Sequence, residues 1–256
     1  MKLSRRSFTL LFLAIALLSL VPVAAEAGPH VVFMIGEREY GTEKTLPEFF
    51  EKELAPKGFT ADFITAPTEG EARNDFPGLE KALAKADLLV VSVRRRAPTT
   101  SQLQALRDYL DKGKPLIGLR TASHAFHLRG EAPPEGHAIW ERFDPEVLGG
   151  NYQNHYGDES FAITPADGAV DSPLLEGVEL KSSSRLYRSG PLAENATPLL
   201  IGTLGENPPE PVAWTHHFGP NNAKVFHTSL GTQEDFAQPG FRRLLANAVT
   251  WALETE

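Results

Sequence analysis

The chain has 256 residues, a formal net charge of −8 and no cysteine. A hydrophobic share of 41%, with 15 Phe and 3 Trp, excludes an intrinsically disordered protein. The missing cysteine excludes disulfides, cysteine-ligated zinc, iron–sulfur clusters and thiol nucleophiles. The acidic balance argues against nucleic acid as a partner, because neutralising phosphates requires clustered Lys and Arg.

Residues 1–27 have the three regions of a signal peptide. The start is basic, an apolar run follows over residues 8–23, and small residues precede the expected cut after Ala27. The apolar run is short for a membrane span. We therefore predict cleavage and no stable membrane span afterwards, with an uncleaved anchor as the alternative.

The pair Arg5-Arg6 lies in a segment that resembles the twin-arginine export motif, although the apolar run also suits the ordinary secretory route. Both routes predict an exported protein, periplasmic or extracellular. The remaining residues, 28–256, contain no internal repeat or low-complexity tract, and a single domain is the simplest account.

Strand and helix patterns alternate in the first half. Runs rich in Val, Ile and Leu indicate buried strands, and apolar residues at i, i+3 and i+4 indicate helices. In chain order we predict a strand at 30–35, a helix from about Thr45 to Gly58, a strand at 59–64, a helix at 79–86, a strand at 87–93, a helix from about 100 to 113 and a strand at 115–119. Four strands that alternate with three helices imply an α/β fold with a mostly parallel sheet covered on both faces.

The repeat pattern breaks after Phe126. Residues 127–158, rich in Gly, Pro, His and aromatic residues, predict an ordered excursion. Further strands are predicted at 160–164, 198–203, 211–216 and 223–229, followed by an amphipathic helix at 241–252.

Ligands of open α/β sheets bind beyond the carboxyl ends of the strands. At these exits the sequence places the segments 37–40, 94–96, 120–127 and 229–235, all rich in polar and charged residues. Solubility alone explains many such residues, and at least one of Arg94 to Arg96 is expected to form salt bridges or face solvent. Arg120 directly follows a predicted central strand, where a guanidinium needs anionic or carbonyl partners.

Histidines are concentrated in the same half of the molecule. His124 and His127 are spaced i, i+3 and can face one ligand on a helical turn. Imidazoles with a carboxylate can hold zinc or another divalent ion, whereas ordinary hydrogen bonds in a polar cleft are the alternative. Because HExxH and HxxEH patterns are missing, we predict no cofactor and keep a divalent metal as the alternative.

Ser123 is the candidate nucleophile, because it follows a strand and precedes a predicted helix. Its surroundings lack both glycines of the GxSxG motif, and a helix N-cap accounts for the same position. The segment 36–40 is not a GxGxxG loop, so a dinucleotide has little support.

Five segments together resemble the ThuA-like (trehalose-utilisation) family, within the class I glutamine amidotransferase-like superfamily. They are GEREYGTEKTLPEFF (36–50), GLRTASHAF (118–126), LGGNYQNHYG (148–157), PVAWTHHFG (211–219) and VFHTSLGTQEDFAQPGFRRLLANAVTWAL (225–253). The resemblance spans nearly all of residues 28–256.

This resemblance implies a flavodoxin-like three-layer α/β/α sandwich and a connection with carbohydrate use, especially trehalose and oxidised disaccharides. The superfamily's amidotransferases carry a catalytic cysteine after the central strand, where this chain has Arg120-Thr121-Ala122-Ser123-His124. The chain is therefore not a glutamine amidotransferase.

We predict a carbohydrate-active isomerase, lyase or hydrolase that acts on a keto sugar or disaccharide. Arg120 would polarise a carbonyl oxygen, His124 or His155 would move the proton, and Glu37 is the reserve base. The predicted substrate-binding residues are Tyr40, Thr121, Ser123, Tyr156, Trp214, His216, Ser229 and Asp235, with the rings of Tyr156 and Trp214 stacking on sugar faces.

Two alternatives stay open at this point: a non-catalytic sugar-binding or interaction module, and a metal-dependent hydrolase. A homo-oligomer is also left open, since no segment marks an interface. The catalytic prediction requires Glu37, Arg120, His124 and Asp235 to converge on one hollow.

Overall fold

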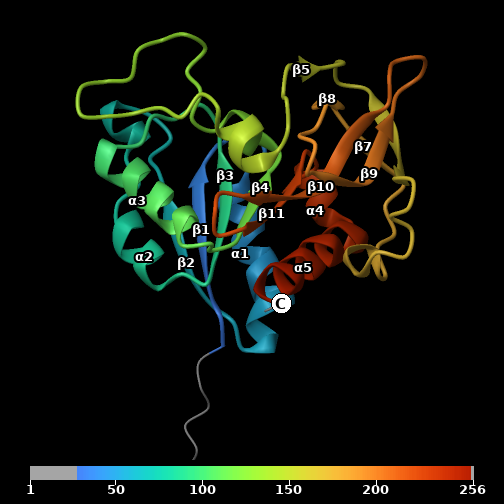
Figure 1. Cartoon of the computed structure of the whole chain (residues 1–256), viewed down its shortest axis with the longest axis horizontal. Coiled ribbons are helices and arrows are strands. Elements are labelled where there is room, and N and C mark those ends of the chain that lie inside the picture. The colour runs from blue at the N-terminus through green and yellow to red at the C-terminus, as the bar shows by residue number, and fades with distance from the viewer. Residues whose placement is uncertain (1–27, 255–256) are drawn as a thin grey trace, which may run out of the picture.

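A nine-stranded sheet forms the centre of the computed structural model, which describes residues 28–254 (Figure 1). The strand order is β2-β1-β3-β4-β11-β10-β9-β6-β7. The first five strands in this order pair in parallel, and the others pair antiparallel. The predicted signal peptide lies outside the described residues.

The parallel half contains the strands that the sequence predicts most directly. They are β1 (His30–Gly36), β2 (Thr60–Thr65), β3 (Leu88–Val93), β4 (Leu116–Leu119) and β11 (Ala223–Thr228). Strands β1, β3 and β4 are covered on both faces, which explains why their sequences are almost continuously apolar.

Helices cover both faces of this half and complete three layers. Helices α1 (Thr42–Phe49) and α5 (Pro239–Leu253) share one core with Phe33 of β1. Helices α2 (Leu79–Lys85) and α3 (Thr100–Asp111) share the other core with Met34. Because successive strand residues point to opposite faces, β1 contributes to both cores. The α/β prediction is confirmed.

The antiparallel half extends the sheet through β10 (Glu210–Phe218), β9 (Thr197–Thr203), β6 (Ser160–Pro165) and β7 (Ser182–Ser184). A separate pair joins β5 (Asn154–His155) to β8 (Tyr187–Arg188). The predicted strands of this region are present. Strands β5, β7 and β8 were not predicted, because their two or three residues carry no readable alternation.

Helix α1 begins at Thr42, three residues before the predicted start. The carboxylate of Glu37 accepts hydrogen bonds from the backbone N–H of Thr42 at 2.8 Å and from its hydroxyl at 2.6 Å. An N–H in the first helical turn otherwise lacks a partner, so this contact fixes the helix start. Pro47 consequently lies inside the helix, which continues as a wider turn over Phe50–Leu54.

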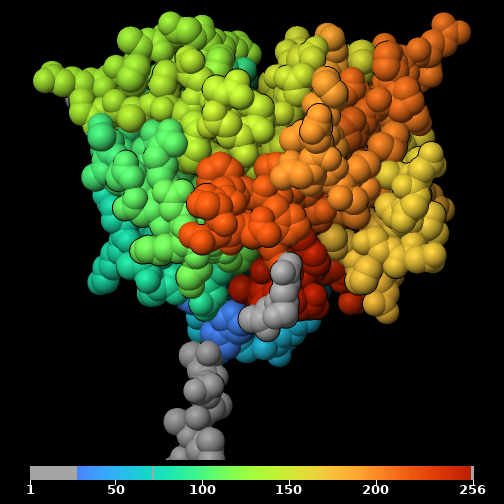
Figure 2. Space-filling view, in the orientation of Figure 1, coloured from blue at the N-terminus to red at the C-terminus, as the bar shows by residue number. Residues whose placement is uncertain are grey.

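The segment 127–158 packs on the core, as predicted for an ordered excursion. Trp140, Phe143, Val147 and Leu148 are buried against the α2/α3 side. In Figure 2 the segment, lime to yellow, forms much of the upper surface in that view. Across residues 28–254, none of the helices combines the length and apolar character needed to cross a bilayer.

Candidate functional site

The loops that follow β1, β3, β4 and β11 meet at one edge of the sheet. The backbone N–H of Arg95, after β3, donates to the carbonyl of His124 at 3.1 Å. The Arg120 guanidinium, after β4, donates to the carbonyl of Ser229 at 2.6 Å. The structure therefore gathers the predicted loops at the carboxyl ends of the parallel strands, where α/β ligands bind.

Arg120 occupies a sharp turn between β4 and a 3-10 helix at Arg120–His124, with φ of 42°. Its side chain is only 2% exposed and lies between two rings, 4.2 Å from the centroid of Tyr40 and 4.7 Å from that of Tyr187. Cation–π contacts and the Ser229 carbonyl hold the guanidinium in place. Its Nε and second terminal nitrogen have no hydrogen-bond partner among the described residues.

Glu37 is committed to local structure. One carboxylate oxygen accepts the Tyr40 N–H at 2.8 Å, and the other accepts both donors of Thr42. The Thr42 hydroxyl also lies 2.9 Å from the Ser92 hydroxyl of β3. The carboxylate therefore ties the β1 loop to helix α1 and to β3, and its oxygens are already occupied by donors.

His124 lines an open cleft of about 570 Å³. Its ring stacks on Tyr152 at 4.4 Å between centroids. The Ser123 hydroxyl lies 3.2 Å from the Arg120 carbonyl and 3.1 Å from His124 Nδ1; when it donates to the carbonyl, its oxygen accepts the proton of Nδ1. This arrangement leaves the lone pair on Nε2. Burial lowers the pKa of His124 well below its usual range, and the charges of Arg95 and Arg94 lower it further, so the ring is neutral at pH 7.

Asp144 lines the same cleft and begins a wide helical turn over Asp144–Leu148. One carboxyl oxygen accepts the Tyr152 N–H at 2.6 Å, while Oδ1 has no partner among the described residues. Burial raises the pKa of Asp144 to about 7, against the smaller opposing effect of the Tyr152 bond. A carboxyl with this pKa can exchange a proton at neutral pH.

Gly150 explains how Asp144 becomes buried. A Cβ at position 150 would meet Asp144 Oδ1 at 2.6 Å and the Trp214 ring at 2.9 Å. The missing side chain lets the chain pass close over the carboxyl and lets Tyr152 reach it.

Three of the predicted binding residues are buried at this edge, and two of them bond within the protein. The Asp235 carboxylate caps α4 (Gln233–Ala237), accepting N–H groups of Gly231 at 2.8 Å and Thr232 at 2.9 Å. Ser229 contributes its carbonyl to Arg120, and the Thr121 side chain is buried. Asp235 lies at the same edge, because the Gly231 that it binds packs beside the Cβ of Arg120, but the four residues expected in one hollow do not share a cavity: Glu37 lines one, His124 lines the neighbouring cleft, and Arg120 and Asp235 line neither of these two.

The expected stacking of a sugar on Trp214 requires correction. The Trp214 ring is fully buried, donates to the Leu148 carbonyl and packs 4.5 Å from the His227 ring. It has no face open to a ligand. His216 is also buried, and its Nδ1 lies 3.1 Å from the Val147 carbonyl. Both side chains anchor the Asp144–Leu148 turn against β10.

His155 and Tyr156 lie in and directly after β5, beside the cleft. His155 is exposed, with its ring 6.4 Å from that of Tyr187. The Tyr156 hydroxyl donates to Glu210 at 3.1 Å. Tyr40, in contrast, lies deeper, against Arg120. The rim and the buried layer are thus joined through Tyr187, which contacts both.

Sequence reasoning missed Asp144, Tyr152 and Tyr187 as candidate site residues. Tyr152 stands in the segment 148–157 that carries the family resemblance, which was a usable signal. Asp144 looked like an ordinary loop acid, because its burial depends on contacts made by Gly150 and Trp214.

The described part of the chain contains no group of three His, Cys, Asp or Glu residues placed to hold a metal ion. His124 and His127 illustrate the reason. The ring of His124 bonds to Ser123, whereas Nδ1 of His127 accepts the Arg129 N–H at 3.1 Å.

Comparison with known proteins places the chain in a family. The family described as "ThuA: Trehalose utilisation" matches residues 30–252. The chain belongs to the ThuA family. No curated protein matches it.

Solved structures support the fold. A ThuA-like protein from Parabacteroides merdae superposes with a TM-score of 0.58 at 15% identity, covering 88% of this chain and 90% of that one. The N-terminal domain of mmIFT52 gives 0.53 at 11% identity, covering 89% and 98%. A β-galactosidase from Bacillus circulans sp. alkalophilus gives 0.52 at 10% identity, covering 90% of this chain and 32% of that one. At these identities the ThuA chain shares the fold with each of them.

Proposed function

We propose that this ThuA-family chain is an exported enzyme that acts on a carbohydrate, an oxidised (keto) sugar or disaccharide, at the cleft lined by His124, Tyr152 and Asp144. The family match supports the substrate class. Export is inferred from residues 1–27 alone. The observation that carries the catalytic part is a neutral imidazole and a carboxyl with a pKa of about 7 in one cleft, both in contact with Tyr152.

The two groups suit opposite proton transfers. His124 Nε2 presents a lone pair to the cleft and is the general base, because Ser123 holds the other ring nitrogen in its protonated form. Asp144, half protonated near pH 7, is the general acid. Such a pair supports removal of a proton beside a carbonyl or departure of an alcohol, the steps that a keto sugar makes accessible.

Sugar recognition is assigned to the polar rim. Asn151, Gln153 and Asn154 line the cleft beside Tyr152. Their amide groups offer both donors and acceptors, which matches the hydroxyl groups of a sugar.

Arg120 then acts as a positioning residue. It is buried and holds Tyr40 and Tyr187 in place, and Tyr187 lies 4.8 Å from the Tyr152 ring between centroids. Glu37 supports the same loop through Tyr40 and Thr42. Both residues thereby shape the wall behind His124.

The decisive experiment compares two histidines. Wild-type protein, His124→Gln and His155→Gln would be incubated with disaccharides and their keto-oxidised forms, with products separated chromatographically. Removing a general base costs about 10²–10⁴-fold in turnover. We expect that loss for His124→Gln and near wild-type turnover for His155→Gln, which is exposed and outside the cleft lining.

The same samples separate the rival function. If the wild type binds a disaccharide in calorimetry but forms no product, the protein is a sugar-binding module and not an enzyme. The absence of turnover would then be explained in part by the carboxylates of Glu37 and Asp235, whose oxygens are occupied by donors. Loss of turnover in His155→Gln instead of His124→Gln would move the proton transfer to the rim. Loss of wild-type turnover on chelation, restored by zinc, would establish a metal-dependent hydrolase.

A further inference from the structure

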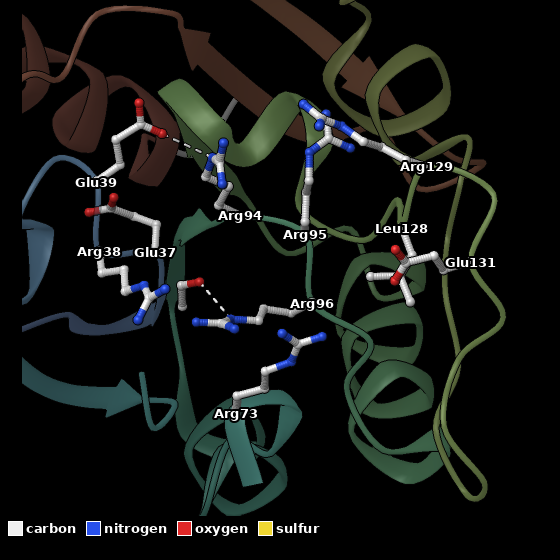
Figure 3. A pocket seen from close by; sticks show the side chains of 11 residues that line it. Glu37, Arg38, Glu39, Arg73, Arg94, Arg95, Arg96, Leu128, Arg129 and Glu131 are labelled. Atoms are coloured by element: carbon white, nitrogen blue, oxygen red, sulfur yellow. Dashed lines mark hydrogen bonds and ion pairs between the residues drawn. The ribbon is translucent and has the colours of Figure 1, made fainter. Parts of the chain in front are cut away.

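A second cavity of about 490 Å³ lies at the ends of β1 and β3, and arginine dominates its lining (Figure 3). Six arginines surround it: Arg38, Arg73, Arg94, Arg95, Arg96 and Arg129. Three carboxylates, those of Glu37, Glu39 and Glu131, share the lining. This excess of positive charge is local, because the whole chain carries a net charge of −8.

Two of the six arginines are neutralised by acidic side chains. Arg38 pairs with Glu69 at 2.8 Å, and Arg94 pairs with Glu39 at 3.1 Å. Arg73, Arg95, Arg96 and Arg129 form no ion pair with any carboxylate whose side chain the structure describes. The lining therefore carries four guanidinium groups outside any ion pair against two remaining carboxylates, those of Glu37 and Glu131, around a space large enough for a small molecule.

Backbone carbonyls fix two of these groups in position. Arg96 Nε donates to the Gly36 carbonyl at 2.9 Å, and an Arg95 terminal nitrogen donates to the His127 carbonyl at 3.2 Å. A guanidinium has five N–H donors, so these bonds hold each group while leaving other donors to a ligand. Figure 3 shows the Arg96 guanidinium beside that of Arg73, and the Arg95 guanidinium beside that of Arg129.

The guanidinium groups around this cavity repel one another. Burial lowers the pKa of Arg96, and the charges of Arg73, Arg38 and Arg94 lower it further. Burial also lowers the pKa of Arg95, and Arg129 is the largest additional cause. An anion between these groups would remove the repulsion and stabilise the folded state by mass action.

We propose that this arginine cavity, lined by Arg73, Arg95, Arg96 and Arg129, binds an oxyanion group of a small-molecule ligand. Planar guanidinium groups bind carboxylate, sulfate and phosphate through paired, charge-assisted hydrogen bonds. Those three oxyanions share the chemistry that the cavity recognises. The excess of guanidinium over carboxylate groups in the lining favours a group that carries two negative charges over one that carries a single charge.

The arginine cavity also adjoins the His124 cleft, because Arg95 and Arg129 line both. A ligand with its anion in the cavity can place a neutral sugar ring in the cleft. If the proposed function holds, the substrate class becomes an acidic or esterified carbohydrate. This step is the one part of the inference that rests on the proposed function. Oxyanion binding itself does not depend on that function.

The test uses calorimetry and thermal melting with defined probes: sulfate, inorganic phosphate, glucuronate and glucose. We expect the three anions to bind and to raise the melting temperature, with affinity falling as sodium chloride is raised. Tighter binding of sulfate and phosphate indicates an ester ligand, and tighter binding of glucuronate indicates a sugar acid. Equal behaviour of glucose and glucuronate, with no response to sulfate or phosphate, overturns the proposal.

Variants locate the site. Arg73 and Arg129 are exposed, so the double variant Arg73→Gln/Arg129→Gln should fold normally, which circular dichroism would check. Removing two charge-assisted contacts should weaken anion binding by about tenfold or more. The matched control is Arg243→Gln, an exposed arginine of α5 outside this cavity, which should bind as the wild type does.

Unchanged anion affinity in the double variant, or an equal loss in the control, overturns the assignment. Turnover is scored separately from binding. Anion binding without turnover of any carbohydrate leaves the arginine cavity in place and rejects the enzyme, whereas turnover of neutral sugars without anion binding does the reverse.

Discussion

Two groups of polar and aromatic side chains at the same sheet edge differ in where their functional atoms point. Glu37, Asp235 and Trp214 direct theirs inward, to backbone groups of the loops they hold. His124 and Asp144 belong to the lining of an open cleft, and each keeps an atom without a hydrogen-bond partner among the described residues, although Oδ1 of Asp144 is buried beneath Gly150. The residue types overlap between the groups, but only the second group keeps atoms whose hydrogen-bonding capacity is unused.

The difference has a physical cause. Loops that leave four strands at one edge contain many backbone N–H groups without a partner in the sheet, and buried donors need acceptors. Side-chain carboxylates at strand exits supply them, as Glu37 does for Tyr40 and Thr42. A charged residue at a strand exit is therefore as compatible with loop closure as with catalysis, and hydrogen-bond partners decide between the two.

Trp214 offers the largest test of this division. Trp214→Ala should lower the free energy of unfolding by about 3–5 kcal/mol, because a fully buried aromatic ring and its bond to the Leu148 carbonyl are lost. Trp214→Phe should unfold more easily than the wild type but keep its KM for sugar. Urea denaturation measures the first effect and steady-state kinetics the second.

The partly exposed Trp251 of α5 is the control for Trp214, and its replacement by alanine should cost less. A raised KM in Trp214→Phe at unchanged stability would return Trp214 to the substrate-binding group.

Asp144→Asn tests the second group, the residues that line the cleft, through the pH dependence of stability. The folded-state pKa of Asp144 is about 7 against an ordinary value of 3.8, so the folded protein favours the protonated carboxyl. Its contribution is fully present below pH 4 and is lost as pH rises through 7. Asparagine stays neutral, so the variant should be more stable at pH 8 by up to about 4 kcal/mol and unchanged at pH 4.

The same variant should lose turnover, because asparagine cannot donate the proton that we assign to Asp144. Thermal melting across pH 4–8 measures the stability change, with the exposed Asp171→Asn as control. Full turnover in Asp144→Asn would remove the residue from the reaction, and an unchanged melting profile would show that the carboxyl is ionised at neutral pH.

The parallel half of the fold was predictable from sequence because its signals are local. Strands β1, β3 and β4 are apolar runs whose burial is written in their own residues. In the antiparallel half, the longer strands were predictable but their direction was not. The two residues of β5 form a strand only because they pair with Tyr187 and Arg188 of β8. The start of α1 was missed because the carboxylate that accepts the first N–H of the helix belongs to Glu37, which lies outside the helix.

The location of the site was predictable from the sequence, but the residues that line the cleft were predicted only in part. The rule about strand exits found Ser123 and His124, which do line the cleft. It did not find Asp144, whose pKa is raised by burial and whose carboxyl lies beneath the chain at Gly150. It also could not separate Arg94, which pairs with Glu39, from Arg96, which faces the arginine cavity without an acidic partner.

His227 gives the smallest and most selective test, because its ring is completely buried beside Trp214 and neither ring nitrogen has a hydrogen-bond partner among the described residues. Complete burial lowers its pKa to about 3. Since the unfolded chain takes up a proton near pH 6.5 and the folded one does not, stability is lost as pH falls below 6.5. The neutral variant His227→Leu should therefore be more stable than the wild type at pH 5 by about 2 kcal/mol.

At pH 8, where the His227 ring is neutral in both the folded and the unfolded chain, the gain should shrink to the smaller effect of removing two unpaired polar atoms. Urea denaturation at the two pH values measures the difference, with the partly exposed His137→Gln as control. A gain of equal size at both values would show that packing against Trp214, rather than proton exclusion, sets the contribution of His227.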